Sequence, residues 1–466
     1  MSTLKLSSDT LGGSVTLAAP TTASDITVTL PTTTGTLATG DATSTITTYA
    51  SVSAIPAGFV GTARIGTDLY VGDGSIITKS NTGLLTTYLG QVATNCRILV
   101  NYFASYWLAN CRTAHVACEL LTNFKVVWPT FYFASGVESN FNGNVTLEAT
   151  VEYPLNTFTR VTFSGVNKAT VTGGNDFLSD FISVKIPANA MFWLRTRLII
   201  PNAAPVGYVT ESGTGIGAGG FSMATSVYGS SSDSGAECAE FLNTASTLTS
   251  KLTTSGLFGS QGAGLVYRPS AIIQQTTRPT YYISGDSIAI GQYDVLDSNT
   301  RSGYLERATK NACINVAVGG ESFGNIFVAP KRIALSQYCS HIITNYGINS
   351  AGSGASYWTS GATTMFNLFP NKPFYFVTLI NQQQTTSNSW VDGGNSATPT
   401  NETNRISINN LIRTMNVAGV AGYIDSDFIN SASFNGAYWK PSMTSDGTHP
   451  NALGNRFLGA NLKMPV

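Results

Sequence analysis

The spacing of hydrophobic positions changes along the chain and divides it into three parts. Within residues 1–90, the first 50 or so carry short alternations of apolar and Ser or Thr positions, each closed by a Pro, Thr or Gly break. Residues 91–277 contain longer alternating runs, and from residue 278 apolar runs of strand length alternate with helical patterns. Alternation with a period of two predicts β-strands, whereas apolar positions at i, i+3, i+4 and i+7 predict a helix. We therefore predict a β-rich segment (1–90), a β domain (91–277) and an α/β domain (278–466).

The N-terminal segment is expected to form short β-strands at residues 14–17 and 25–30. A segment of this size can hardly bury a core of its own, so its strands would pair with other chains or with a larger assembly. Its composition also fits a flexible tail. Residues 61–74 predict a hairpin with Asp73 and Gly74 as the turn pair, because Asp-Gly favours the tight turns of hairpins.

The middle part is expected to be an antiparallel β-sandwich of jelly-roll type. Several short strands separated by turn residues are typical of this architecture. Aromatic side chains on its surface could stack on sugars, and a packing domain that binds nothing fits the sequence equally well. The expected strands cover residues 144–151, 160–163, 181–186 and 191–200, with a turn at 187–190.

The C-terminal part is expected to hold a parallel sheet of about five strands flanked by helices. Strands that alternate with helices form parallel sheets covered on both sides, and ligands bind at the carboxyl ends of such strands. The expected strands cover residues 281–283, 314–318, 342–346, 374–380 and 420–424. Two helices carry their apolar faces at Ile408, Leu411, Ile412 and Met415 and, after Pro450, at Leu453, Phe457, Leu458 and Leu462.

Small and polar residues follow three of these strands and precede the last helix. Gly285-Asp286-Ser287 follows the first strand, Gly319-Gly320 follows the second, and Asn349 follows the third. The run Ser-Asp-Gly-Thr-His-Pro at 445–450 lies just before the last helix. A serine on a turn after a buried strand is suited to nucleophilic attack, because the strand fixes it and the turn exposes its hydroxyl. Since these segments share one edge of the sheet, we expect their side chains to meet there.

These four blocks, in this order, resemble those of the SGNH (GDSL-type) hydrolases over residues 278–463. The resemblance implies a flavodoxin-like sheet and a serine esterase that needs no metal and no cofactor. It makes Ser287 the nucleophile, His449 the general base and Asp446 the acid that orients it. The oxyanion hole would be formed by the N–H groups of Ser287 and Gly320 and by the side-chain amide of Asn349.

The match leaves two positions to note. Ser350 stands where the family often has an acidic residue that is not catalytic, and Gly319 would serve if the glycine block lay one position earlier. Among the three histidines of the chain, His341 opens an apolar strand and His115 lies in the β domain. Only His449 has a neighbouring carboxylate in a loop at the expected edge of the sheet.

Each polar residue also has a structural alternative. Asp446 could cap the last helix, because aspartate is a favoured N-cap. Asn349 could serve a turn, and Asp286 is expected to hold its own turn rather than to react. Asp425 and Asp427 also follow a strand and could compete as the acid of the triad, although they lack the short spacing to the proposed base.

Composition excludes several classes of protein. The 466-residue chain has a net charge of zero and 11% charged residues, which argues against nucleic-acid binding and against a basic membrane-binding surface. The six cysteines are scattered, which predicts neither a disulfide framework nor a zinc site. We expect no signal peptide and no membrane insertion. The glycines Gly215, Gly217 and Gly220 form a GxGxxG pattern without the surroundings of a nucleotide site.

The N-terminal segment resembles the particle-proximal segments of bacteriophage tail fibres and tailspikes, through residues 11–31 and 61–74. This resemblance implies a homotrimeric virion protein that joins other tail or baseplate proteins through its N-terminus. Together the two resemblances imply that it binds and O-deacetylates a bacterial surface polysaccharide, such as O-antigen or capsule. The alternatives are a receptor-binding fibre without activity, a general lipase or esterase, and a cellular polysaccharide esterase. A long amphipathic lid near the site would favour the lipase, and none is evident in the sequence.

Overall fold

The chain divides into two compact units, Met1–Leu85 and Thr86–Val466. The computed structural model describes residues 87–383, 390–391, 400–431 and 436–464, apart from 99, 135, 142, 211–237, 243–248 and 256–264, and only strands β1–β6 of the first 86 residues. The GxGxxG glycines and the strand expected at 25–30 therefore lie outside the described residues.

The first unit consists, in its described part, of one strand pair and one small sheet. Strands β1 (Thr3–Ser7) and β2 (Ser14–Ala18) pair in antiparallel orientation. The sheet has the order β3–β4–β5–β6, with bounds Thr47–Thr48, Val60–Ile65, Asp68–Asp73 and Ile77–Ser80. The predicted strand pairing is present as β4 and β5, but the predicted turn is wrong: Asp73 pairs with Val60, at the opposite end of the ladder from the Ile65–Asp68 pair that adjoins the connection. Asp73 ends β5, and Gly74 lies outside the described residues.

Two largely antiparallel sheets form the first part of the second unit and share one buried core. The larger sheet has the order β12–β11–β9–β17–β13–β14, with β15 beside β13, β18 beside β9 and β19 beside β17; the smaller has the order β16–β10–β20–β7. Their strands are β7 (Tyr88–Gln91), β9 (Val100–Val116), β10 (Lys125–Trp128), β11 (Phe131–Ala134), β12 (Val137–Asn140), β13 (Asn144–Glu152), β14 (Phe158–Arg160), β15 (Ala169–Thr172), β16 (Phe177–Leu178), β17 (Met191–Thr210), β18 (Cys238–Leu242), β19 (Leu265–Val266) and β20 (Ala271–Thr276).

Two of the strands expected here are not formed. Only the first residue of 160–163 belongs to a strand, and 181–186 makes two isolated bridges, Ile182 to Phe124 and Ile186 to Leu121. The bridging residues are four apart on one segment and three apart on the other, so no continuous ladder can connect them. The buried alternation of this segment therefore arises from packing of Ile182 and Ile186 rather than from strand pairing.

The C-terminal part contains a parallel sheet of six strands in the order β25–β24–β23–β21–β22–β8. The strands are β8 (Cys96–Arg97), β21 (Tyr281–Ser284), β22 (Cys313–Asn315), β23 (His341–Thr344), β24 (Phe374–Val377) and β25 (Gly422–Ile424). Five of them are those expected. Strand β21 is one residue longer than expected, β22 and β23 begin one residue earlier and end sooner, and β24 and β25 are shorter. The sixth, β8, comes from the part of the sequence assigned to the β domain, and two residues are too few to show a periodic pattern.

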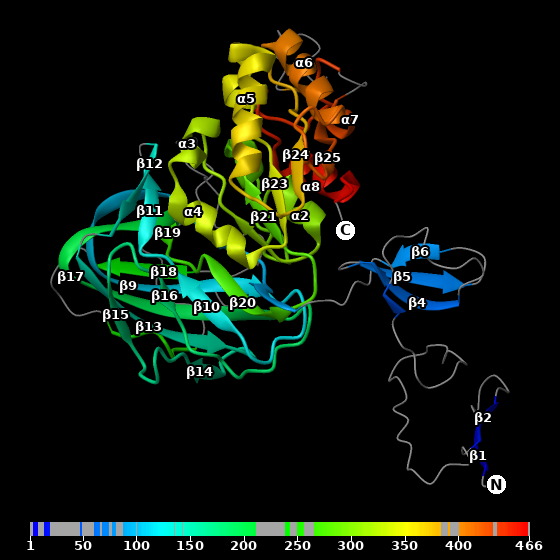
Figure 1. Cartoon of the computed structure of the whole chain (residues 1–466). Helices are drawn as coiled ribbons and strands as arrows, with labels where there is room; N and C mark the ends of the chain where they lie inside the picture. The colour runs from blue at the N-terminus through cyan, green and yellow to red at the C-terminus, as the bar shows by residue number, and fades with distance from the viewer. Residues whose placement is uncertain are drawn as a thin grey trace. The chain divides into compact units, whose positions relative to one another are not determined.

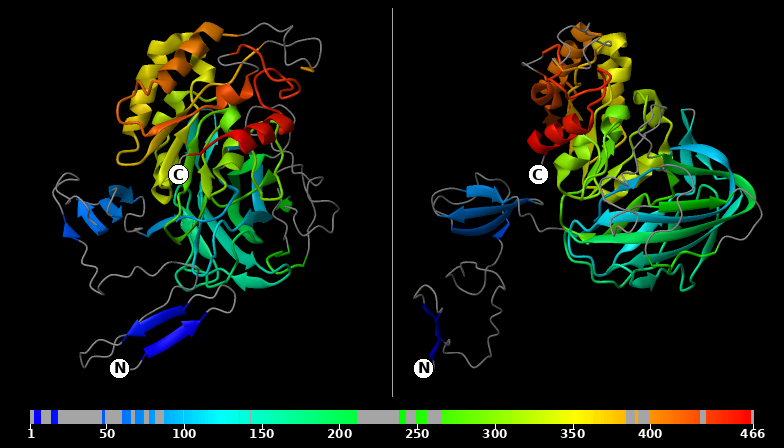
Figure 2. Two further views of the ribbon diagram at one scale, coloured as in Figure 1. Left: turned by 90° about the vertical axis from the view of Figure 1, so that its right-hand side faces the viewer. Right: turned by 180° about the vertical axis from the view of Figure 1, so that it is seen from behind.

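Helices flank this sheet (Figures 1 and 2). Helix α2 packs against α8, and α5 packs against α3 and α6. The predicted faces are largely correct, but Met415 and Leu453 are 49% and 51% exposed, because Met415 lies beyond the end of α6 and Leu453 is in the first turn of α8. The helices are α1 (Ser287–Ile290), α2 (Tyr304–Thr309), α3 (Phe323–Phe327), α4 (Pro330–Ala334), α5 (Gly354–Asn367), α6 (Glu402–Arg413), α7 (Ser426–Asn430) and α8 (Ala452–Asn461), with 3-10 helices η2 (Leu335–Tyr338) and η3 (Ile348–Ser353).

A second core lies between the parallel sheet and its helices and continues into the antiparallel region. It includes Val127, Phe133 and Ile273 of the antiparallel sheets besides the residues of the parallel strands. In the described part of the chain, Cys96, Cys118, Cys313 and Cys339 are buried free thiols. In the same part of the chain, no helix has the length and apolar character needed to cross a bilayer.

Candidate active site

The segment that carries Ser287 is a sharp turn between a buried strand and a short helix. All four residues of β21 are buried, and Gly285 follows with φ +154°. A Cβ atom at Gly285 would lie 1.7 Å from Oδ1 of Asn345, so only glycine fits this turn. Asp286 then caps α1 by accepting the Ile288 N–H at 2.9 Å. Ser287 is thereby fixed as the first residue of α1, at the carboxyl edge of the sheet.

The structure brings Ser287, His449 and Asp446 into one hydrogen-bonded chain. His449 Nε2 lies 2.7 Å from Ser287 Oγ, across 162 residues of sequence. His449 Nδ1 lies 2.6 Å from Oδ2 of Asp446. The other carboxylate oxygen accepts the backbone N–H groups of Thr448 and His449 at 2.9 and 2.8 Å. A serine, an imidazole and a carboxylate in this order have the arrangement of a catalytic triad.

The alternative in which Asp446 caps the last helix is wrong. Helix α8 begins at Ala452, and its N-cap is Asn451, whose side chain accepts the Gly454 N–H at 3.0 Å. Asp446 lies outside this helix and directs Oδ2 toward the imidazole.

Asp425 and Asp427 are committed to arginines and do not reach His449. Asp425 accepts Arg413 Nε at 2.8 Å and also caps α7 through the Phe428 N–H. Asp427 forms an ion pair with the buried Arg405. These two carboxylates therefore hold α6 and α7 together, and Asp446 is the acid beside the imidazole.

The loop that carries Asp446 and His449 is held by residues that the sequence analysis did not single out. Gly447 has φ +81°, and a Cβ atom there would lie 2.4 Å from the ring of Trp390. The Gly447 carbonyl accepts the indole N–H of Trp439 at 3.0 Å and the backbone N–H of Gln383 at 2.9 Å. Both tryptophans are buried. The only signal in the sequence for these supports was the tryptophans themselves, because a buried indole N–H needs a hydrogen-bond acceptor. Nothing in the sequence indicates that this acceptor lies in the loop of Asp446 and His449.

The predicted oxyanion-hole residues lie on neighbouring turns. Gly320 follows β22 with φ +79°, and a Cβ atom there would meet nothing within 4 Å. The positive φ rather than crowding is thus what favours glycine at this position. Asn349 lies in η3 after β23, and its side-chain amide donates to the carbonyl of Glu321 at 2.8 Å. Among the described residues, the N–H groups of Ser287 and Gly320 donate to no protein acceptor.

The pKa values of Asp446, which binds His449, and of Asp286, which precedes Ser287, are shifted in opposite directions. Burial alone would raise the pKa of Asp446, but the hydrogen bond from His449, the nearby imidazole charge and two backbone N–H groups outweigh it and lower the pKa. Asp286 is fully buried, and burial raises its pKa from 3.8 to about 6 despite the bonds from Ile288 and Asn345. One of its oxygens, Oδ2, has no hydrogen-bond partner in the described structure.

Asp286→Asn is expected to make the protein more stable at neutral pH. The folded-state pKa of about 6 lies above the 3.8 of the free side chain, so the folded protein binds this proton more tightly than the unfolded chain. The stability that Asp286 contributes is therefore fully present below about pH 4 and is lost as the pH rises through 6, by up to roughly 3 kcal/mol. The variant should gain relative to the wild type between pH 4 and pH 7.

Denaturant unfolding of both proteins at pH 4 and pH 7 measures this difference. Asp180→Asn is the control of opposite sign, because hydrogen bonds from the Gly165 N–H and Thr162 lower the pKa of that partly exposed carboxylate. A stability difference between wild type and Asp286→Asn that stays constant from pH 4 to pH 7 would contradict the expectation.

The remaining histidines have structural surroundings, and one aromatic ring faces the candidate base. His115 is buried between Thr94 and Thr113, and burial lowers its pKa to about 3. His341 is the first residue of β23, as expected. Tyr293 lies edge-on to His449 with ring centroids 5.4 Å apart.

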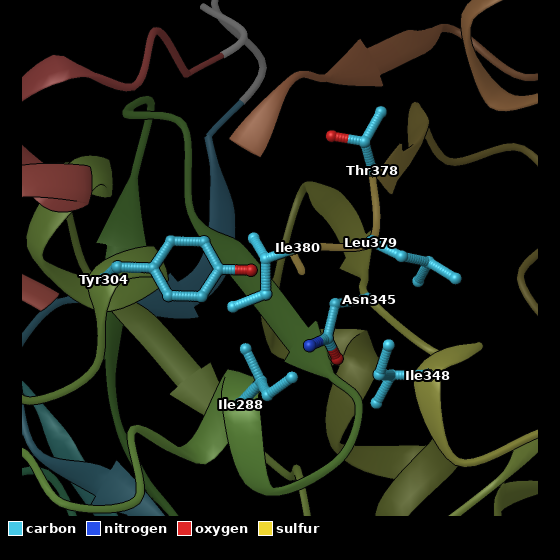
Figure 3. A pocket seen from close by; sticks show the side chains of 7 residues that line it. All are labelled: Ile288, Tyr304, Asn345, Ile348, Thr378, Leu379 and Ile380. Atoms are coloured by element: carbon cyan, nitrogen blue, oxygen red, sulfur yellow. The ribbon is translucent and has the colours of Figure 1, made fainter. Parts of the chain in front are cut away.

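A small cavity of about 10 Å³ lies beside α1, which is room for about one water molecule. The Tyr304 hydroxyl and the Asn345 amide point into the space between the apolar side chains (Figure 3). Within the described ranges, no three His, Cys, Asp or Glu side chains are grouped closely enough to hold a metal ion. The cavity is lined by Ile288, Tyr304, Asn345, Ile348, Thr378, Leu379 and Ile380.

No protein-family model and no curated protein matches the chain. Solved structures of GDSL-like lipases and acetyl xylan esterases are distantly similar. A GDSL-like lipase from Bacteroides thetaiotaomicron is 13% identical with a TM-score of 0.30, over 39% of this chain and 84% of that one. An acetyl xylan esterase from Geobacillus stearothermophilus is 11% identical with a TM-score of 0.29, over 40% and 97%. A GDSL-like lipase from Bacteroides ovatus is 14% identical with a TM-score of 0.28, over 75% and 80%. Likenesses at this level assign neither a family nor an activity.

Proposed function

We propose that this protein is a serine carboxylester hydrolase of the SGNH type. The observation that carries the proposal is the continuous chain from Ser287 Oγ to His449 and on to Asp446, with distances of 2.7 and 2.6 Å. A hydroxyl hydrogen-bonded to an imidazole that a carboxylate orients is the arrangement that makes serine a nucleophile at neutral pH.

In the proposed reaction, Ser287 Oγ attacks the ester carbonyl while its proton passes to His449 Nε2. The imidazolium that forms is stabilised by Asp446, which keeps the other ring proton on Nδ1. His449 then donates its proton to the departing alcohol, leaving an acyl group on Ser287. Water, deprotonated by His449, attacks this acyl-enzyme and releases the acid and the free serine.

The negative charge of each tetrahedral intermediate would be met by the N–H groups of Ser287 and Gly320 and by the amide of Asn349. The first two N–H groups are not used within the described protein. The Asn349 amide uses one N–H for Glu321, and its second N–H remains to donate. Preorganised donors of this kind lower the barrier of acyl transfer by roughly 3–4 kcal/mol each.

For the substrate, we propose an O-acetylated bacterial surface polysaccharide, which the protein binds and deacetylates as part of a phage tail. The support is the resemblance of residues 11–31 and 61–74 to virion-attachment segments. The antiparallel sheets that adjoin the hydrolase core add support, because they provide a surface on which a long polymer could lie. A homotrimer attached through its N-terminus follows from the same resemblance, and sedimentation equilibrium tests it.

Active-site labelling together with hydrolysis of 4-nitrophenyl esters tests the proposed activity. We expect hydrolysis of the acetate ester, and stoichiometric labelling by a fluorophosphonate that mass spectrometry locates on Ser287. Faster hydrolysis of octanoate than of acetate would favour the general lipase instead. If neither hydrolysis nor labelling of Ser287 is observed, the esterase is excluded and the receptor-binding fibre without activity is favoured. Acetate release from purified, acetylated polysaccharides then tests the substrate.

A further inference from the structure

Glu321 follows the proposed oxyanion-hole residue Gly320 and is buried, with 3% of its surface exposed. Its carboxylate forms a two-pronged pair with Arg332, with Nη2 to Oε1 at 2.8 Å and Nη1 to Oε2 at 2.9 Å. The Tyr346 hydroxyl donates to Oε2 at 2.8 Å. Both carboxylate oxygens are therefore bound, and the side chain is held in one position.

Glu321 also connects the two turns that carry the proposed oxyanion donors. Gly320 precedes it directly in the chain, and the Glu321 carbonyl accepts the side-chain amide of Asn349 at 2.8 Å. The turn after β22 and the helix η3 after β23 thus meet at this residue. A displacement of Glu321 would move the Gly320 N–H through the backbone and the Asn349 amide through its hydrogen bond.

Arg332 is fixed from the other side by the antiparallel region. Its guanidinium donates to the Val316 carbonyl at 3.2 Å and lies 4.2 Å from the ring centroid of Phe133 on β11. Glu138 of β12 accepts the backbone N–H groups of Lys331 and Arg332 at 3.0 and 2.7 Å. Figure 1 shows β11 and β12 beside α3 and α4. The larger antiparallel sheet therefore contacts α4, the helix whose Arg332 binds the Glu321 carboxylate.

Burying this ion pair is costly, so its short distances are weak evidence that it is present for stability. Burial raises the pKa of Glu321 above its ordinary value, and this effect exceeds the opposing effects of Arg332 and of the Tyr346 hydrogen bond. A buried ion pair often contributes less to stability than an apolar pair of the same size, while the two parallel N–H···O bonds from Arg332 fix the orientation of the carboxylate. A position next to two oxyanion donors is one where fixed geometry affects the reaction rate.

We infer that Glu321, held by Arg332 and through it by Glu138, is a positioning residue for the oxyanion hole. The antiparallel region thereby supports catalysis as well as any binding of the polymer. This inference rests on the proposed esterase function and assigns that region a role in the rate of the reaction.

The test compares kcat, KM and the pH profile of acetyl-ester hydrolysis in Glu321→Gln and the wild type. The substitution keeps the shape of the side chain and removes the charge. We expect kcat to fall about 10- to 100-fold, less than the loss of a whole donor, with KM changed less than about threefold because the ground-state ester makes weaker bonds to the hole. The midpoint of the kcat–pH profile should stay in place, because the His449–Asp446 pair is untouched.

The matched control is Glu402→Gln, which removes a comparable partner of Arg405 at 2.6 Å on α6. It should destabilise the fold without changing kcat. If Glu402→Gln lowers kcat as much as Glu321→Gln does, or if folded Glu321→Gln keeps the wild-type kcat, the inference is wrong.

A double-mutant cycle provides the sharper readout. If Glu321 acts by placing Asn349, then Glu321→Gln should cost clearly less in an Asn349→Ala background than in the wild type. Independent, additive losses would contradict the positioning role. Should Glu321→Gln fail to fold, Glu138→Gln takes its place, because it leaves the Glu321–Arg332 pair intact and should lower kcat several-fold. A wild-type kcat in folded Glu138→Gln would then overturn the inference.

The outcome also separates this inference from the proposed function. Equal inactivity of the wild type and Ser287→Ala would remove the esterase and the inference together. An active wild type with an inactive Ser287→Ala and a fully active Glu321→Gln would remove the inference alone.

Discussion

Replacing Ser287 with alanine is expected to lower kcat/KM for acetyl esters by about 10⁴-fold or more, because no acyl-enzyme can form without the hydroxyl. The remaining oxyanion donors would still give slow, direct attack by water. Folding should be nearly unaffected, because α1 keeps its cap: Asp286 accepts the Ile288 N–H whichever side chain stands at 287. Steady-state hydrolysis of 4-nitrophenyl acetate and a thermal melt of the same preparation measure both quantities.

The control for this prediction is Ser445→Ala, an exposed serine in the loop that carries the proposed acid and base. It should keep the wild-type kcat/KM. Residual activity of Ser287→Ala within tenfold of the wild type would show that another group is the nucleophile, and the proposed mechanism would then be abandoned.

Asp446→Asn is expected to lower kcat by about 10⁴-fold with little effect on KM, because the amide reverses the hydrogen bond to the imidazole. Asp446 Oδ2 now accepts from His449 Nδ1 at 2.6 Å, which leaves Nε2 free to accept the serine proton. An amide NH₂ at that position donates instead, so Nδ1 becomes the acceptor and the ring proton moves to Nε2. In that tautomer the imidazole cannot act as a base toward Ser287. The backbone bonds to Oδ1 can persist, so the loop should keep its shape.

Asp425→Asn is the matched control, because Asp425 was the alternative acid in the sequence. Its carboxylate binds Arg413 and caps α7, so the variant should lose roughly 1–3 kcal/mol of stability. Its kcat should stay within about twofold of the wild type. The reverse pattern, with activity lost in Asp425→Asn and kept in Asp446→Asn, would reassign the acid.

Much of the parallel sheet could be predicted from the sequence, because its strands are continuous apolar runs and the chemistry follows directly after them. Ser287 and Asn349 stand out because they follow apolar strands directly, and Asp446 and His449 stand out because they lie together just before the last helix. The spacing of three between Asp446 and His449 is short enough for local backbone geometry to bring their side chains together. The structure places them in contact.

Short or non-periodic contributions could not be found in this way. Strand β8 consists of Cys96 and Arg97 alone, and its place at the edge of the parallel sheet depends on partners more than 200 residues away in sequence. Residues 181–186 alternate like a strand, but their partners are spaced differently and allow only isolated bridges. Periodicity reports which side chains are buried and does not specify the segment against which they pack.

The sequence by itself determined the succession of the five strands along the chain, the turn at Ser287 and the residue types of the triad, because these depend on local pattern and short spacing. Tertiary structure alone decided that His449 reaches Ser287 across 162 positions and that Asp425, the alternative acid, binds Arg413 instead. It also placed Glu138 of the antiparallel region behind Arg332 and Glu321. The physical reason is that contacts between distant segments arise from the packing of whole sheets and helices, and no local pattern encodes which distant residue completes a buried pair.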